Sequence, residues 1–334
     1  MEITLQMKKL NKVSIERKKI VFNKEKHFDY SKYHIKYNSK NHSHPKEVIS
    51  ISNINIIRCI LVLNENEFVV SISNNQSQHQ LQLYEFNNKR KKFEFKSIIA
   101  NHKLAIICVI HSKINNLHII SSSFDKTIQI NHINKKESTI MLKGHKTAVL
   151  SLFEIEAKNL LLSSSFDRNI IIWNMTTYAN EKTIKGENVI YKFDFFPLMD
   201  SIICGCKEKI IGLRISNEMK IETKEFLTAT SIISFALCKN NKIVYSKGEN
   251  SIIVYDVKEE KEVHQITFND KIKMIKKDDE YILLFGEEKN IYIINEENYE
   301  LVTKVYLNSI FSFNSIYIYN HCIFYNEDKT ILQI

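Results

Sequence analysis

Histidine, serine and aspartate recur together in the central part of the chain, and these residue types could perform hydrolytic chemistry. Two sets occupy equivalent positions: His102, Ser123 and Asp125, and then His145, Ser165 and Asp167. In a hydrolase, such residues act as nucleophile, general base and the acid that orients the base. The set is duplicated, however, and a catalytic triad is not normally copied from one repeat to the next. We therefore predict no catalytic residues and no enzyme activity.

The spacing of the two sets defines a sequence repeat. His102 and His145 lie 43 positions apart, and Asp125 and Asp167 lie 42 positions apart. Each aspartate ends a copy of the same five residues, Ser-Ser-Ser-Phe-Asp. A period in the low forties that begins with Gly-His and ends with Trp and a polar residue is typical of one propeller blade.

The elements that position these residues are predicted to be β-strands. In the second repeat, apolar runs cover 148–155, 160–162 and 170–173, and polar turns separate them. The runs are short, rich in β-branched residues and without a 3.6-residue period, which favours strands over amphipathic helices.

Residues 101–174 resemble the WD-repeat β-propeller family, most clearly in the segment Gly144-His145 to Ile172-Trp173-Asn174. In that family, the turn aspartate accepts a hydrogen bond from the histidine, which a serine links to the tryptophan indole. The resemblance therefore implies a buried structural network, because unpartnered buried polar groups cost about 1–3 kcal/mol each. The implied members are His145, Ser165, Asp167 and Trp173, with His102, Ser123 and Asp125 in the preceding repeat.

Stepping by the same period predicts an all-β protein, a seven-bladed β-propeller of four-stranded antiparallel blades. The third strands of the blades end near positions 84, 131, 173, 213, 255, 294 and 334. The motifs are degenerate outside the two central repeats, so six and eight blades stay open as alternatives and apolar packing is expected to hold the later blades. Residues 47–52 are the first candidate, and residues 3–7 the second, for a strand that closes the ring and removes its unpaired edge.

The composition is that of an intracellular protein without a membrane span. No apolar run approaches the roughly 18 residues that a bilayer requires, and the N-terminus lacks the apolar core of a secretory signal. The six cysteines are scattered and suit a reducing compartment better than a disulfide framework. We expect a cytoplasmic location, with a nuclear one as the alternative.

The net charge of +9 is concentrated before the predicted propeller. Residues 1–46 contain twelve Lys or Arg and four Asp or Glu, whereas residues 47–334 are nearly neutral. We expect two parts, a partly flexible basic tail (1–46) and the propeller (47–334). The tail interleaves its charges with aromatic residues, so it suits a solvated arm, protein docking, or binding to nucleic acid or an acidic lipid surface.

Cofactor and metal sites are not predicted. The six glycines never cluster into a phosphate-binding loop. His34, His42 and His44 could ligate zinc, but no cysteine or carboxylate lies nearby at ligand spacing.

The candidate contact residues follow from the family resemblance. In WD-repeat propellers, the residue before the turn aspartate lies on the narrower face, where peptides commonly bind. These positions hold Phe124 and Phe166, and Lys126 and Arg168 follow the aspartates. Aromatic residues and arginine often carry interface energy, although each phenylalanine could instead pack on its neighbouring blade.

We predict a non-enzymatic scaffold or adaptor that binds proteins or peptides as part of a hetero-complex. The alternative is a nucleic-acid-associated factor, in RNA processing or ribosome assembly, anchored through the tail.

Overall fold

The computed structural model describes residues 46–50, 56–74, 77–90, 92–135, 139–229, 231–239, 241–248, 250–278, 281–306, 317–319, 322–327 and 330–333. Side chains are described for these residues except Leu198 and those of 46–50, 317–319, 322–327 and 330–333. Residues 1–45 of the predicted basic tail, with the histidines weighed as zinc ligands, therefore lie outside the described residues.

The second central repeat folds into one four-stranded antiparallel sheet. Its strands are β10 (Val149–Ile155), β11 (Leu160–Ser165), β12 (Asn169–Asn174) and β13 (Asn180–Lys185), paired in chain order. All six residues of β11 are buried. Continuous burial, rather than alternation, arises because both faces of a central strand pack against neighbouring sheets. The outermost strand β13 is mostly exposed.

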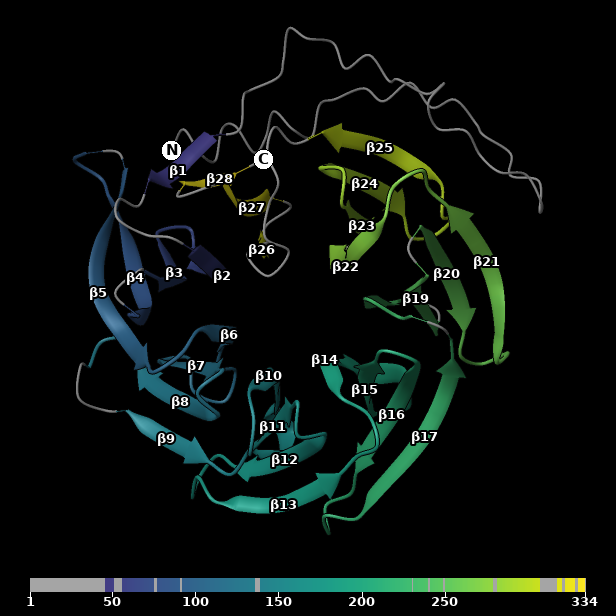
Figure 1. Ribbon diagram of the computed structural model, residues 1–334, viewed down its shortest axis with the longest axis horizontal. Helices are drawn as coiled ribbons and strands as arrows, with labels where there is room; N and C mark the ends of the chain where they lie inside the picture. The colour runs from purple at the N-terminus through teal and green to yellow at the C-terminus, as the bar shows by residue number, and fades with distance from the viewer. Residues whose placement is uncertain are drawn as a thin grey trace, which may run out of the picture.

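Six sheets of this kind follow one another around a ring, with the first strand of each sheet nearest the centre (Figure 1). The other five are β2 (Ile56–Asn64), β3 (Glu67–Ser73), β4 (His79–Asn87) and β5 (Lys92–His102); β6 (Ile106–His111), β7 (His118–Ser123), β8 (Thr127–His132) and β9 (Ile140–Lys143); β14 (Ile190–Phe196), β15 (Ser201–Cys206), β16 (Lys209–Ile215) and β17 (Ile221–Thr228); β18 (Phe235–Cys238), β19 (Lys242–Lys247), β20 (Ser251–Asp256) and β21 (Lys261–Thr267); β22 (Ile272–Asp278), β23 (Tyr281–Gly286), β24 (Asn290–Asn295) and β25 (Leu301–Tyr306).

The predicted number of seven blades requires a correction. Six blades are each built from four consecutive strands with described side chains. The remaining four strands form a composite sheet in the order β1-β28-β27-β26, whose side chains are not described. They are β1 (Lys46–Ser50), β26 (Tyr317–Tyr319), β27 (Cys322–Glu327) and β28 (Thr330–Gln333). The structure is thus six single-segment blades plus one closing sheet, because both ends of the chain are used to join the ring.

The closing contact lies in the segment that the sequence favoured for it. Strand β1 pairs antiparallel with β28, and Lys46 lies opposite Gln333 at one end while Ser50 lies opposite Thr330 at the other. Such pairing removes the free edges that an open ring would expose. The second candidate, residues 3–7, lies outside the described residues.

The hydrophobic core lies between neighbouring blades. A representative cluster joins the blade β10–β13 to the blade β14–β17 through Leu162, Ile172, Phe193, Cys204 and Leu213, all at most 6% exposed. Burial raises the pKa of Cys59 to about 12 and that of Cys206 to about 11, so these thiols stay neutral and act as small apolar side chains. No helix in the described residues is long and apolar enough to cross a membrane.

Candidate functional site

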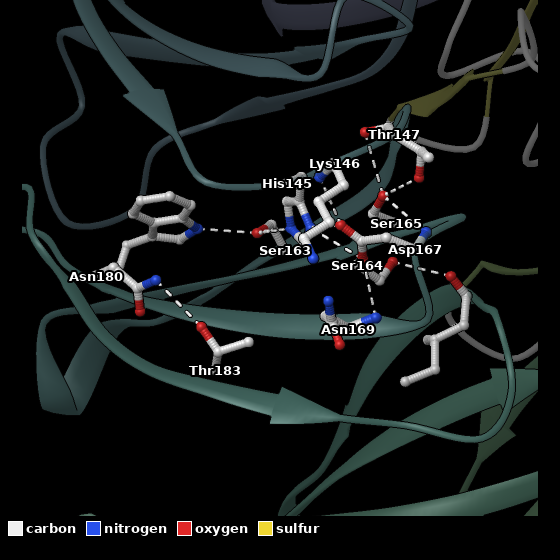
Figure 2. A network of polar contacts seen from close by, with 12 residues as sticks. His145, Lys146, Thr147, Ser163, Ser164, Ser165, Asp167, Asn169, Asn180 and Thr183 are labelled. Carbon is white, nitrogen blue, oxygen red and sulfur yellow. Dashed lines mark hydrogen bonds and ion pairs between the residues drawn. The ribbon is translucent and has the colours of Figure 1, made fainter.

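A chain of four polar side chains runs through the blade β10–β13 (Figure 2). The indole Nε1 of Trp173 lies 2.8 Å from Ser163 Oγ, which lies 2.8 Å from His145 Nε2. His145 Nδ1 lies 3.0 Å from Asp167 Oδ2. The chain links the third strand of the blade, its second strand and the loop that enters it, and so fixes their relative register.

The hydrogen-bond chemistry gives the chain one direction. The indole can only donate, and an ionised carboxylate can only accept. His145 therefore carries its proton on Nδ1 and donates to Asp167, while its Nε2 accepts the hydroxyl proton of Ser163. Ser163 in turn accepts from Trp173, so every polar atom of the chain is used with a neutral imidazole.

The serine in this network differs from the one we predicted. Ser163, not Ser165, bridges His145 and Trp173. Ser165 instead accepts from the backbone N–H of Asp167 at 3.2 Å and lies 2.9 Å from the hydroxyl of Thr147, so it shapes the turn. The two serines lie two residues apart on one strand, and only the inner one lies within reach of the indole.

The upstream blade repeats the arrangement in a shorter form. His102 Nδ1 lies 2.9 Å from Asp125 Oδ2, and its Nε2 lies 3.0 Å from Ser121 Oγ. The predicted Ser123 again belongs to the turn, where it donates to the carbonyl of Leu104 at 2.8 Å. The position equivalent to Trp173 holds Asn131, whose buried Nδ2 has no hydrogen-bond partner in the described part of the chain.

Burial separates this network from a working hydrolase triad, even though Ser163, His145 and Asp167 lie in triad order. Ser163 is 0% exposed and the His145 side chain 1% exposed, so no substrate carbonyl can reach the hydroxyl. The hydroxyl also already accepts from Trp173. A nucleophile must lie next to the reacting atom of a substrate, and this one lies inside the core.

Two aspartates anchor the network in ionised form. Burial acts to raise the pKa of Asp167, but hydrogen bonds from the backbone of Lys146 and Asn169 and from His145 outweigh it and lower the pKa. For Asp125, burial is likewise outweighed, here by bonds from His102 and Thr127, and the pKa falls well below its usual range. Carboxylates that accept several hydrogen bonds favour their charged form.

The network should make the fold sensitive to mild acid. Burial lowers the pKa of His145 below its ordinary value of 6.5, although Asp167 opposes the shift. The unfolded chain then binds more protons than the folded one, so stability is complete above pH 6.5 and falls as the pH drops through that value. We expect the free energy of unfolding, measured by urea titration, to decrease from pH 7 to pH 5.

The matched variant for this pH effect is His145→Asn, which is less stable at pH 7 but has no imidazole to protonate. Its free energy of unfolding should change less between pH 7 and pH 5 than that of the wild type. Equal slopes in both proteins would contradict the role given to His145.

The blade β22–β25 is held by a buried hydrogen-bonded carboxylate. For this blade the sequence led us to expect mainly apolar packing. Asp270, in the loop that enters the blade β22–β25, is 3% exposed. It accepts from the backbone of Glu288 at 3.0 Å and from Asn290 Nδ2 at 2.8 Å. A Cβ on Gly286 would lie 1.9 Å from Asp270 Oδ2, so the close approach requires glycine there. In this blade, the carboxylate of Asp270 links the entering loop to the turn and the third strand, as His145 and Asp167 do together in the blade β10–β13.

The four predicted contact residues lie on one face of the ring. Phe124 and Phe166 occupy the turns between the second and third strands of two neighbouring blades and are 41% and 45% exposed. Lys126 and Arg168 follow in the same turns with positive φ values of 73° and 65°, and both are exposed. The Phe166 ring also makes an edge contact with Tyr191 of the next blade, at 6.4 Å between centroids.

Four further exposed apolar residues lie on the same face, which we call the turn face. They stand where the chain enters an innermost strand and are 40–49% exposed: Ile56, Leu104, Tyr191 and Ile233. The sequence prediction missed them, because each belongs to an ordinary apolar run. The signal is structural: at Tyr191, a register shift between Ile190 and Lys192 turns the side chain away from the core.

Comparison with known proteins agrees with the fold. The family model described as WD domain, G-beta repeat matches residues 136–174, which cover β9 of the preceding blade and β10, β11 and β12 of the network blade. Residues 136–174 thus carry the signature of one WD repeat. The WD40 β-propeller domain of Doa1 superposes with a TM-score of 0.68 over 87% of this chain and 96% of that domain, at 13% identity. At that identity, the likeness to the Doa1 domain concerns the fold alone.

Two curated relatives are similar over part of this chain. A WD repeat-containing protein 89 homolog from Dictyostelium discoideum is 26% identical over 147 residues, which is 42% of this chain and 40% of the relative. The ribosome biogenesis protein YTM1 from Meyerozyma guilliermondii is 22% identical over 178 residues, 51% of this chain and 39% of the relative. The matches thus span about two fifths of each relative's length.

Proposed function

We propose that this protein is a non-enzymatic scaffold whose turn face binds a peptide or an extended segment of a partner protein. The observation that carries the proposal is the gathering of exposed aromatic and aliphatic side chains on that face. Phe124 and Phe166 keep more than two fifths of their surface in water although the core around them is closely packed. Clusters of exposed apolar side chains rimmed by polar groups are typical of interaction sites.

Charge suggests the chemistry of the partner. Exposed cationic residues surround the two phenylalanines, namely Lys103, Lys126, Lys146 and Arg168. The neighbouring carboxylates, Asp125 and Asp167, are already occupied by hydrogen bonds within the fold. A segment that presents an apolar anchor next to acidic side chains would therefore complement this surface.

The second candidate function is a factor in ribosome assembly or another RNA process, with residues 1–46 as a basic tail and residues 47–334 as the propeller. Two observations support it. The first is the +8 charge of that segment, interleaved with aromatic residues. The second is that one of the relatives, YTM1, is a ribosome biogenesis protein. A tail of this composition suits RNA through charge and stacking.

Pull-down from cell extract with two baits, the full chain and residues 47–334, separates the two functions. Each bait is used at low and at moderate salt. We expect protein partners to stay with both baits, because the turn face is present in both. Nucleic acid captured only by the full chain, and released as salt rises, would instead assign the function to the tail.

A further inference from the structure

Two neighbouring blades carry the same surface unit on the turn face. Each unit joins the segment that enters an innermost strand to the turn between the second and third strands of the same blade. The entering segments have equal length, His-Lys-Leu-Ala before β6 and His-Lys-Thr-Ala before β10. We call the two sets of residues the first and the second unit, namely Lys103, Leu104, Phe124 and Lys126, and then Lys146, Thr147, Phe166 and Arg168.

Matching hydrogen bonds give the two units the same backbone geometry. The backbone N–H of the entering lysine donates to the turn aspartate, and the backbone N–H of the turn phenylalanine donates to the carbonyl of the entering alanine. The bonds are Lys103 to Asp125 (2.9 Å) and Phe124 to Ala105 (3.0 Å), and then Lys146 to Asp167 (2.8 Å) and Phe166 to Ala148 (3.2 Å). The residue after each aspartate has a positive φ, 73° at Lys126 and 65° at Arg168.

The cationic side chains of the units are available to a ligand. All four are exposed, and none forms an ion pair with a residue that the structure describes: Lys103, Lys126, Lys146 and Arg168. The carboxylates in the two turns, Asp125 and Asp167, have side chains at most 7% exposed and already accept from histidine and backbone donors. Each unit therefore offers one exposed phenylalanine and two cations, which complement an apolar side chain flanked by carboxylates.

Each unit also has a second exposed apolar side chain. Leu104 is 49% exposed in the first unit, where the second unit has Thr147 in contact with Ser165. In the second unit, the ring of Phe166 contacts Tyr191 of the next blade, which is 47% exposed. Both units can therefore receive an apolar anchor, although different side chains complete them.

The corresponding turns of the other four single-segment blades lack the aromatic side chain. Their described residues are polar or glycine: Asn74, Ser77, Gln78, Lys207, Glu208, Gly248, Asn250, Glu287, Glu288 and Lys289. Within the described part of the chain, the unit thus occurs on two blades that follow one another, β6–β9 and β10–β13.

The two units lie close together on the ring. Ser122, two residues before Phe124, donates from its hydroxyl to the carbonyl of Val149 on β10 at 3.1 Å. The residue before Val149 accepts from the backbone N–H of Phe166. The two sheets also share one core cluster, so they pack face to face. Sheets packed in this way lie about 10 Å apart, and the separation of the units is therefore on the order of 10 Å.

This separation decides which kind of partner can use both units. Two folded domains cannot occupy positions so close together, because a 100-residue domain has a radius of gyration of about 13 Å. One extended segment can reach both units, because a strand advances about 3.3 Å per residue and covers the separation in three to four residues. Residues four apart in a strand also point to the same side, so both can face the phenylalanines at once.

We propose that the two units together bind one extended segment of a partner protein that carries the same motif twice. The motif is an apolar side chain flanked by carboxylates, and the two apolar anchors lie about four residues apart. The inference rests on the proposed function of the turn face and adds the number, spacing and chemistry of the partner's anchors. Binding at both units is tighter than at either alone, because the second contact forms within one complex.

The test is calorimetric titration of the full chain with three synthetic nine-residue peptides. The tandem peptide is Ser-Asp-Leu-Glu-Ser-Asp-Leu-Glu-Ser, and the single peptide has serine in place of the second leucine. The neutral peptide is the tandem one with asparagine and glutamine in place of its carboxylates. The tandem peptide should bind one per chain and at least about tenfold more tightly than the single peptide. The neutral peptide should bind about tenfold more weakly than the tandem peptide.

Two separate substitutions locate the tandem effect. Phe124→Ala and Phe166→Ala should each weaken binding of the tandem peptide about tenfold, to the level of the single peptide. Each should change the affinity for the single peptide by no more than about twofold, because the other unit still binds it. Leu117→Ala is the matched control and should leave both affinities unchanged. Leu117 is 49% exposed and lies in the loop between β6 and β7, at the opposite end of β7 from Phe124.

Four outcomes would overturn the proposal. They are equal affinities for the tandem and single peptides, a loss in only one of the two phenylalanine variants, two tandem peptides bound per chain, and no binding of either peptide. The variant with both phenylalanines replaced, assayed against a natural partner, separates this failure from that of the proposed function. If that variant loses its partner while the peptides fail, only the tandem motif is wrong. If it keeps its partner, the proposed function itself fails.

Discussion

Replacing Ser163 by alanine should lower the free energy of unfolding by about 3 kcal/mol. The substitution leaves two buried groups without partners, the indole N–H of Trp173 and Nε2 of His145. Each unpaired buried group costs about 1–3 kcal/mol, and little water can enter a site where the serine is 0% exposed. Urea unfolding at pH 7 measures the effect as a lower midpoint with an unchanged slope.

The matched control for Ser163 is Ser165→Ala, two residues along the same strand. Ser165 accepts a hydrogen bond in the turn at the end of the strand. Its replacement by alanine should lower the free energy of unfolding by about 1 kcal/mol. If Ser163→Ala does not fold, Trp173→Phe tests the same bridge. It removes the indole N–H together with part of a ring that is 2% exposed, so it should cost more than the roughly 1 kcal/mol of a lost hydrogen bond. A larger loss from Ser165→Ala than from Ser163→Ala would show that the bridging role has been assigned to the wrong serine.

Replacing both Phe124 and Phe166 by alanine should abolish most partner binding while the propeller stays folded. Aromatic anchors at the centre of an interface commonly contribute 2 kcal/mol or more, so we expect a combined loss of about 3 kcal/mol, roughly a hundredfold in affinity. Quantitative mass spectrometry of proteins retained by wild-type and variant baits measures the loss. The unfolding free energy should change by less than about 1 kcal/mol, because both rings are more than two fifths exposed.

The control for this double variant is Phe95→Ala with Tyr306→Ala. These side chains are 53% and 65% exposed but lie on the outermost strands β5 and β25, away from the turn face. The control bait should retain the same proteins as the wild type. Loss of partners from the control, with retention by the turn-face variant, would move the binding site to the outer edge of the ring.

The repeat in the sequence was sufficient to predict the family, the strand pattern and the closing of the ring near residue 47. Ser-Ser-Ser-Phe-Asp marks the end of a second strand and its turn, and both copies occupy those places. The pattern could not separate Ser163 from Ser165, because residues two apart on a strand share one face. The choice depends on how far the indole of Trp173 reaches across the sheet, which spacing does not encode.

Other features escaped the sequence for reasons specific to the residues involved. Tyr191 reads as part of an apolar strand, and only an irregularity in strand pairing turns it to solvent. Asp270 reads as a loop charge, but it is buried against Gly286 and Asn290.

The central claim is that the turn face binds a partner, and the affinity of one purified partner tests it most directly. Isothermal titration calorimetry would compare the wild type, the Phe124→Ala and Phe166→Ala double variant, and the outer-edge control. We predict equal dissociation constants for the wild type and the control, and one about a hundredfold higher for the double variant. Equal affinities in all three proteins would contradict the account and place the contact elsewhere on the chain.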